Sequence, residues 1–183
     1  CMRRSYLTGD TSDFDAALDA SDRTVALART AGLPELESTA LRTGAAALRA
    51  LGRFDEALAR FEQALAVAQS AGLEYQEATA WTAWSSLSVR LGRWKVAAAA
   101  LERVADTFER TGRVMRRAHA LAEWGLALST GGQLDDAEAC LERAISLTRE
   151  VGDPAGQIRP LYDLAGVLVA RGDFLGAEAA AAE

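Results

Sequence analysis

Glycine recurs at a fixed interval along most of the chain. Two series of glycines each keep one constant spacing of about 40 residues. They are Gly52, Gly92, Gly132 and Gly172, and Gly32, Gly72, Gly112 and Gly152. A fixed period of about 20 to 50 residues is typical of arrays in which one supersecondary unit is stacked repeatedly. We therefore expect a repeat protein in which each unit packs mainly on its neighbours.

Each period holds two amphipathic stretches that the glycines separate. The apolar residues of one stretch recur in steps of three and four, which places them on one face of a helix. They are Phe54, Ala57, Phe61, Ala64 and Leu65. Asp55 and Glu56 fall in the first turn, where the helix dipole favours negative charge, and Gly72 marks the helix end. Each period is therefore predicted to be a helical hairpin that buries its apolar face by stacking.

Copies of the pattern begin near residues 12, 52, 92, 132 and 172, and the last copy is truncated. We expect the array to occupy residues 12–183, after an N-terminal remnant at residues 1–11. Only 7% of the residues are aromatic and alanine is abundant, which favours helices packed closely through small side chains. The predicted fold class is all-α. The initial Cys1 and the final alanine-rich run indicate a fragment of a longer chain.

Large and small residues alternate along each copy in a recognisable order. In one copy they are Trp81, Trp84, Ser85, Gly92, Trp94, Ala97, Leu101 and Val104, and in the next Leu121, Trp124, Gly125, Leu128, Gly132, Leu134, Ala137, Leu141 and Ala144. This pattern resembles the tetratricopeptide repeat. The resemblance implies a right-handed α-solenoid of stacked antiparallel helix hairpins. The period exceeds the usual repeat length of about 34 residues, and in this it resembles a subclass found in bacterial LuxR-like and antibiotic-type regulators.

The resemblance implies that the first helix of each hairpin lines a concave surface where ligands of the family bind. The candidate binding residues are Arg42, Arg49, Thr82, Ser86, Arg90, His119, Glu123, Arg159, Tyr162 and Asp163. Arginine offers bidentate hydrogen bonds to carboxylates, so this surface would suit an extended peptide that carries acidic groups. The alternative is that these side chains form only the solvated inner face of the solenoid.

Several other residues have a structural and a functional interpretation. The four tryptophans, Trp81, Trp84, Trp94 and Trp124, match family positions for large packing residues, so we expect core rather than a ligand cage. His119 is either a pH-sensitive or ligand-binding group or an ordinary polar surface residue. Cys140 lies among apolar neighbours with no histidine nearby, which favours a small packed side chain over a nucleophile.

The residues supply no catalytic set. The chain has one histidine, no Cys-His pair and no glycine-rich phosphate loop, so we predict neither an enzyme nor a cofactor or metal site. A net charge of −6 argues against a nucleic-acid-binding fragment. No signal peptide or membrane span is recognisable, which favours a cytoplasmic location and no membrane contact.

Two places depart from the repeat pattern. Pro160 follows the helix start at Asp153-Pro154 by only a few residues, so we expect this helix to begin late or bend. Alternatively, residues 154–159 form a separate turn that moves Arg159 toward the groove. The last helix should start near Phe174, span about ten residues and leave its apolar stripe exposed or covered by another chain.

The leading functional hypothesis is a non-catalytic scaffold that binds a protein or peptide segment, within a larger bacterial cytoplasmic regulator. A first alternative is a domain that senses a small-molecule inducer for a transcriptional regulator. A second alternative is a homo-oligomerisation module that self-associates through its uncapped C-terminal end.

Overall fold

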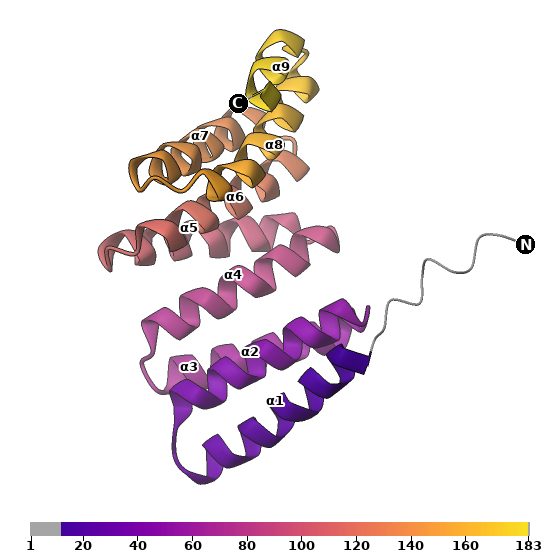
Figure 1. Ribbon diagram of the computed structural model, residues 1–183, viewed down its shortest axis with the longest axis vertical. Coiled ribbons are helices and arrows are strands. Elements are labelled where there is room, and N and C mark those ends of the chain that lie inside the picture. The colour runs from indigo at the N-terminus through magenta and orange to yellow at the C-terminus, as the bar shows by residue number, and fades with distance from the viewer. Residues whose placement is uncertain (1–11, 183) are drawn as a thin grey trace, which may run out of the picture. The chain divides into compact units, whose positions relative to one another are not determined.

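The computed structural model describes residues 12–182, and within them every regular element is an α-helix. Consecutive helices pack as antiparallel neighbours from α1 to α3 and from α5 to α9 (Figure 1). They are α1 (Ser12–Thr30), α2 (Pro34–Ala50), α3 (Phe54–Ser70), α4 (Glu74–Arg90), α5 (Trp94–Arg110), α6 (Val114–Thr130), α7 (Leu134–Glu150), α8 (Pro154–Arg171) and α9 (Phe174–Ala182). The predicted all-α array of helix hairpins is confirmed. The expected N-terminal remnant lies outside the described residues.

The helices are joined by turns of two or three residues, each built around one glycine of the two series. Gly52 has a φ of 76°, in the left-handed region that residues with a Cβ rarely adopt. Its amide donates to the carbonyl of Arg49 at 3.1 Å, and the amide of Arg53 donates to that of Leu48 at 2.9 Å. These two bonds satisfy carbonyls that the helix end leaves open. The glycine period therefore sets where each helix ends.

The described chain divides into two compact units, the first ending at Ala80 and the second beginning at Trp81. In the first unit, α2 packs against both α1 and α3. Its small residues permit this approach: Ala45 is fully buried, and the hydroxyl of Ser38 donates to the carbonyl of Ala64 at 3.0 Å. The hydroxyl of Ser21 on α1 donates likewise to the carbonyl of Ala40 at 2.7 Å. Small side chains thus bring the helices of the first unit into close contact.

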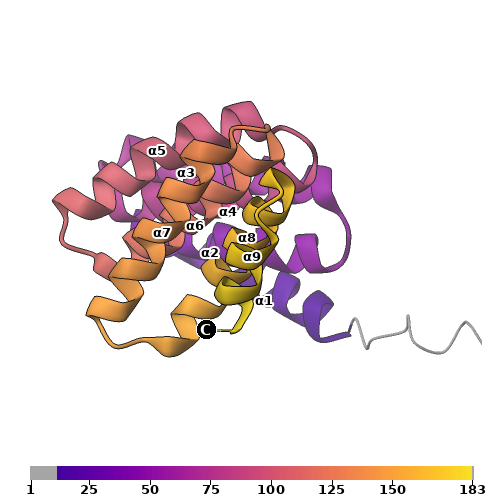
Figure 2. The ribbon, with the colours of Figure 1, turned by 90° about the horizontal axis from the view of Figure 1, so that it is seen from above.

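In the second unit, α6 packs against α5 and α7 and also contacts α8. Leucines at equivalent places of successive helices, Leu101, Leu121 and Leu141, are fully buried and form its core. Figure 2 shows the last pair, α8 and α9, side by side. Helices α2, α4, α6 and α8 are called first helices below, and the others second helices.

The tryptophans differ in how deeply they are buried. Trp84 is buried and meets the ring of Trp81 edge-on, with the ring centroids 5.4 Å apart. Trp81, Trp94 and Trp124 are only half-buried. The ring of Trp94 lies directly over Gly131 at the end of α6, where a Cβ would come within 2.4 Å of it. The expected packing role therefore holds for Trp84 and Trp94, while Trp124 lines a cavity.

Helix α8 corrects one expectation. It begins at Pro154 and runs without interruption to Arg171, so a late start and a separate turn over residues 154–159 are both wrong. Asp153 caps its start by accepting from the amide of Gly156 at 3.0 Å. Pro160 is buried at the place that Ala120 occupies in the preceding first helix. The cap and this burial offset the hydrogen bond that the proline ring removes.

Helix α9 begins at Phe174, as expected, and is nine residues long. Phe174 and Leu175 are 69% and 81% exposed, and Ala177 is its buried residue. The residue equivalent to Phe174 in α5, Trp94, is covered by the end of the following first helix. The apolar residues at the start of α9 are thus left uncovered by the described part of this chain.

Candidate functional site

The predicted binding residues are divided between the two units. Arg42 and Arg49 lie on α2 in the first unit, and the other eight lie in the second. Within the second unit, the contact between α6 and α8 brings together Glu123, Arg159 and Asp163. We call the surface formed by these three residues with His119 and Tyr162 the α6–α8 face.

An ion pair organises the α8 side of this face. The Nε atom of Arg159 donates to Oδ2 of Asp163, one helical turn further on, at 2.7 Å. This hydrogen bond raises the pKa of Arg159 above its ordinary value, and the nearby negative charges of Asp163 and Glu123 act in the same direction. Asp163 is nearly buried whereas Arg159 is exposed. The pair therefore uses part of the hydrogen-bonding capacity that Arg159 would offer a ligand.

Glu123 is buried on the α6 side of the face, with 7% of its surface exposed. Its Oε2 atom has no hydrogen-bond partner among the residues that the structure describes. A buried carboxylate oxygen without a donor is energetically unfavourable. The α6–α8 face thus covers a buried acceptor whose hydrogen-bonding capacity is not used within the described residues. Sequence reasoning placed Glu123 on this face but could not predict its depth.

The remaining candidates are less closely grouped. Tyr162 is 76% exposed, and His119 and Arg90 are exposed as well. Ser86 is half-buried, and Thr82 is buried and already has a partner, so its hydroxyl offers little to a ligand. In the first unit, Arg42 is half-buried and Arg49 is exposed.

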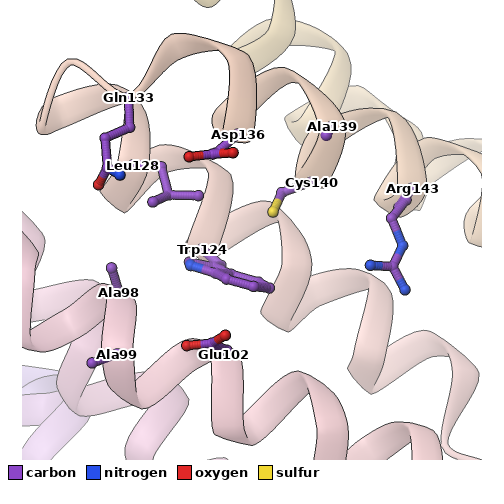
Figure 3. A pocket seen from close by; sticks show the side chains of 10 residues that line it. All are labelled: Ala98, Ala99, Glu102, Trp124, Leu128, Gln133, Asp136, Ala139, Cys140 and Arg143. Atoms are coloured by element: carbon purple, nitrogen blue, oxygen red, sulfur yellow. The ribbon is translucent and has the colours of Figure 1, made fainter.

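A cavity of about 490 Å³ lies elsewhere in the second unit, and sequence reasoning missed it. It opens between the second helices α5 and α7, with Trp124 and Leu128 of α6 at its floor (Figure 3). Its charged lining residues are Glu102, Asp136 and Arg143. A helical step of four residues separates Trp124 from Leu128, and both lie on a different side of α6 from Glu123. The cavity is therefore separate from the α6–α8 face.

Cys140 borders this cavity and is buried. Burial raises the pKa of its thiol from about 9.0 to about 11. The burial agrees with the interpretation of Cys140 as a small packed side chain, and the raised pKa keeps its thiol protonated at neutral pH.

Residues 12–182 contain no cluster of His, Cys, Asp and Glu side chains that could hold a metal ion. None of the helices in this range is both long and apolar enough to cross a membrane.

Comparison with known proteins agrees with this geometry. Residues 36–110 match the family described as tetratricopeptide repeat. No curated protein sequence matches the chain.

Several solved structures share the fold, among them the following three. The crystal structure of BtubC from P. vanneervenii is 20% identical, with a TM-score of 0.73, over 91% of this chain and 87% of that one. A signal transduction ATPase with a tetratricopeptide repeat sensor from Pyrococcus horikoshii is 19% identical, with a TM-score of 0.78, over 91% and 26%. Bacillus thuringiensis PlcR, in complex with the peptide PapR7 and DNA, is 12% identical, with a TM-score of 0.70, over 94% and 63%. At these identities the likeness concerns the fold alone.

Proposed function

Because residues 36–110 belong to the tetratricopeptide repeat family and the described chain has its fold, we propose that the protein is a non-catalytic scaffold that binds a protein or peptide segment. The folding units of such arrays present extended surfaces rather than enclosed catalytic clefts. We assign the main contact to the α6–α8 face of the second unit.

The observation that carries this assignment is the unsatisfied Oε2 atom of Glu123. An extended peptide presents main-chain amides and side-chain donors along its length. One of them would supply the missing hydrogen bond once the side chains that cover Oε2 move aside. The exposed ring of Tyr162 offers a large contact area on the neighbouring helix at a low entropic cost. A donor buried against Glu123 and an apolar contact on Tyr162 together would fix the position of the peptide.

The arginines favour acidic groups in the same partner. Within residues 12–182, Arg42, Arg49 and Arg90 form no salt bridge, whereas Arg159 is paired with Asp163. Unpaired guanidinium groups bind carboxylates through two parallel hydrogen bonds. An acidic side chain of a partner bound to the second unit would therefore face Arg90. In the first unit, taken by itself, Arg42 and Arg49 offer the same kind of contact.

The finer proposal is that this chain serves within a larger bacterial cytoplasmic regulator. The fold likeness to PlcR, whose structure contains a peptide and DNA, is what supports it. The net charge of −6 favours a peptide rather than DNA as the partner of this part of the chain.

Two other functions have some support in the structure. The cavity between α5 and α7 is large enough for a small inducer. The exposed Phe174 and Leu175 of α9 would suit self-association, which light scattering over a range of concentrations would reveal as a rising mass.

A peptide selection tests the proposed function. Peptides chosen from a random displayed library on the wild-type chain should bind Tyr162→Ala and Arg90→Ala at least about fivefold more weakly. Glu123→Gln should also weaken binding, because the amide brings its own N–H donors to the site. Both surface variants should keep the wild-type melting temperature, since Tyr162 and Arg90 are exposed.

Arg103→Ala is the matched control, because Arg103 is an exposed arginine on the second helix α5. Peptides that bind Tyr162→Ala and Arg90→Ala as tightly as the wild type would rule out the first-helix surface of the second unit as their site. If Arg103→Ala loses as much peptide affinity as Arg90→Ala, the peptides respond to positive charge in general and not to Arg90.

A further inference from the structure

The place of the cavity beside Trp124 has an equivalent in the first unit, two repeat periods earlier in the sequence. Helices α1, α2 and α3 there take the places of α5, α6 and α7. Three equivalent pairs matter most: Asp22 with Glu102, Gly44 with Trp124, and Arg60 with Cys140. Comparing the two units therefore shows how different side chains occupy the same place in the repeat.

In the first unit, the side chain of Arg60 fills this location. Its guanidinium forms an ion pair with Asp22, and its Nη2 atom donates to the hydroxyl of Ser21 at 3.3 Å. The side chain lies against Gly44, where a Cβ would come within 2.7 Å of Nε, and only 16% of it is exposed. The fold thus holds a largely buried guanidinium between two second helices, paired with a carboxylate of the preceding one.

In the second unit, the guanidinium is missing and only the carboxylate of its surroundings is kept, because Leu101 stands at the place of Ser21 and Trp124 at that of Gly44. The short side chain of Cys140 replaces Arg60 and leaves the cavity of about 490 Å³. Glu102 takes the place of Asp22 and forms no ion pair among the described residues. Figure 3 shows the carboxylates of Glu102 and Asp136 on opposite sides of the Trp124 indole. An aromatic ring flanked by two carboxylates attracts a cation through both its π face and their charge.

We propose that this cavity binds an arginine side chain of a partner protein. The guanidinium lies on Trp124 and pairs with Glu102, while the alkyl stem contacts Ala98 and Leu128 at the cavity wall. Arg143 lies beyond Cys140, away from the two carboxylates, so two negative charges face one positive charge around the cavity (Figure 3). This site is independent of the α6–α8 face, because it lies on a different side of α6.

The probe for this site is N-acetyl-arginine methylamide, and the neutral citrulline analogue of the same shape is its control. Titration of the arginine probe should shift the indole N–H resonance of Trp124, while the citrulline analogue should leave it in place. Glu102→Gln should weaken probe binding about fivefold. Glu142→Gln should not, because Glu142 occupies the equivalent exposed place on α7 outside the cavity.

Two further variants sharpen the test. Cys140→Arg restores the residue found in the first unit, so its own side chain should occupy the cavity and abolish probe binding while the melting temperature is kept. Arg143→Gln removes a repulsive charge and should strengthen binding about twofold.

The proposal is overturned if the probe leaves the Trp124 resonance unmoved or if the citrulline analogue shifts it equally. It is also overturned if Arg143→Gln abolishes binding, which would identify a site for anions. Free L-arginine that binds more tightly than the capped probe would identify a metabolite site and exclude a partner's side chain.

Discussion

Gly125 lies at a close approach of α6 to α7. A Cβ at this position would come within 2.7 Å of Cγ of Leu141 and 3.1 Å of the carbonyl oxygen of Ala137. Neither neighbour is the free end of a flexible side chain, so neither can move aside easily. Gly166 on α8 is also inside a first helix, but a Cβ there would meet no atom within 4 Å.

These two glycines give opposite predictions for the same substitution. Gly125→Ala should lower the free energy of unfolding by about 1–3 kcal/mol, because the added methyl group overpacks the interface. Gly166→Ala should raise it by about 0.5–1 kcal/mol, because alanine loses less backbone entropy in a helix. Urea unfolding of both variants measures the difference. A loss of stability in both variants would contradict the prediction that only Gly125 lacks room for a methyl group.

At the same scale, the sequence spacing assigns the binding candidates to first helices but does not indicate how deeply each side chain lies. The helical spacing of His119, Glu123, Arg159 and Asp163 placed them on first helices, and the structure groups Glu123, Arg159 and Asp163. Whether a side chain on such a face is buried depends on what the neighbouring helix carries, which one sequence does not reveal. Glu123 is consequently buried whereas Tyr162 is exposed.

Among the helices, α8 carries a proline at a place where the other first helices carry alanine. Pro160 has no amide hydrogen to donate to the carbonyl of Gly156, four residues earlier. Pro154, in contrast, occupies the first position of the same helix, where no intrahelical donor is required. The two prolines therefore make opposite contributions to one helix.

Pro160→Ala should raise the free energy of unfolding by about 1–3 kcal/mol, because it restores one helical hydrogen bond and matches Ala120 in α6. Pro154→Ala should leave it unchanged or lower it by up to about 1 kcal/mol, since proline restricts the unfolded chain. Thermal and urea unfolding compare the two variants. If Pro160→Ala is destabilising, then the ring contributes more through its buried contacts than it costs the helix.

Helix boundaries were the most predictable feature at this scale. The repeat spacing identifies the glycines that end the helices, and in the structure each of them has a positive φ angle. The late start and the separate turn expected for α8 are wrong because that expectation weighed the local effect of Pro160 alone. Tertiary packing of the helix, together with the Asp153 cap, outweighs one missing hydrogen bond.

At the scale of the whole molecule, helices of one array differ in how many neighbours support them. Within the second unit, α6 packs on α5, α7 and α8, whereas α9 packs on α8. Local opening is easiest where few buried contacts must be broken. The amides of α9 should therefore exchange with deuterated water at least about tenfold faster than those of α6. Equal protection of the two helices would indicate that the second unit opens only as a whole.

The fold class could be predicted from the sequence because a single period, kept along nearly the whole chain, leaves few architectures. The cavity could not, because it arises from differences between copies rather than from what they share. Trp124 matches the repeat pattern, whereas Cys140 stands where the two preceding copies carry Arg60 and Ala100, and both line the space between α5 and α7. Aligning the copies and comparing side-chain volumes would have indicated it.

The turns of two or three residues also determine how a protease can attack this protein. A protease binds its substrate as an extended stretch of main chain, and the hydrogen-bonded turns between α1 and α9 are too short to provide one. Cleavage within residues 12–182 must therefore wait until part of a helix unwinds. The rate of limited proteolysis would then report the stability of individual helices, and the fragments would identify which of them opens first.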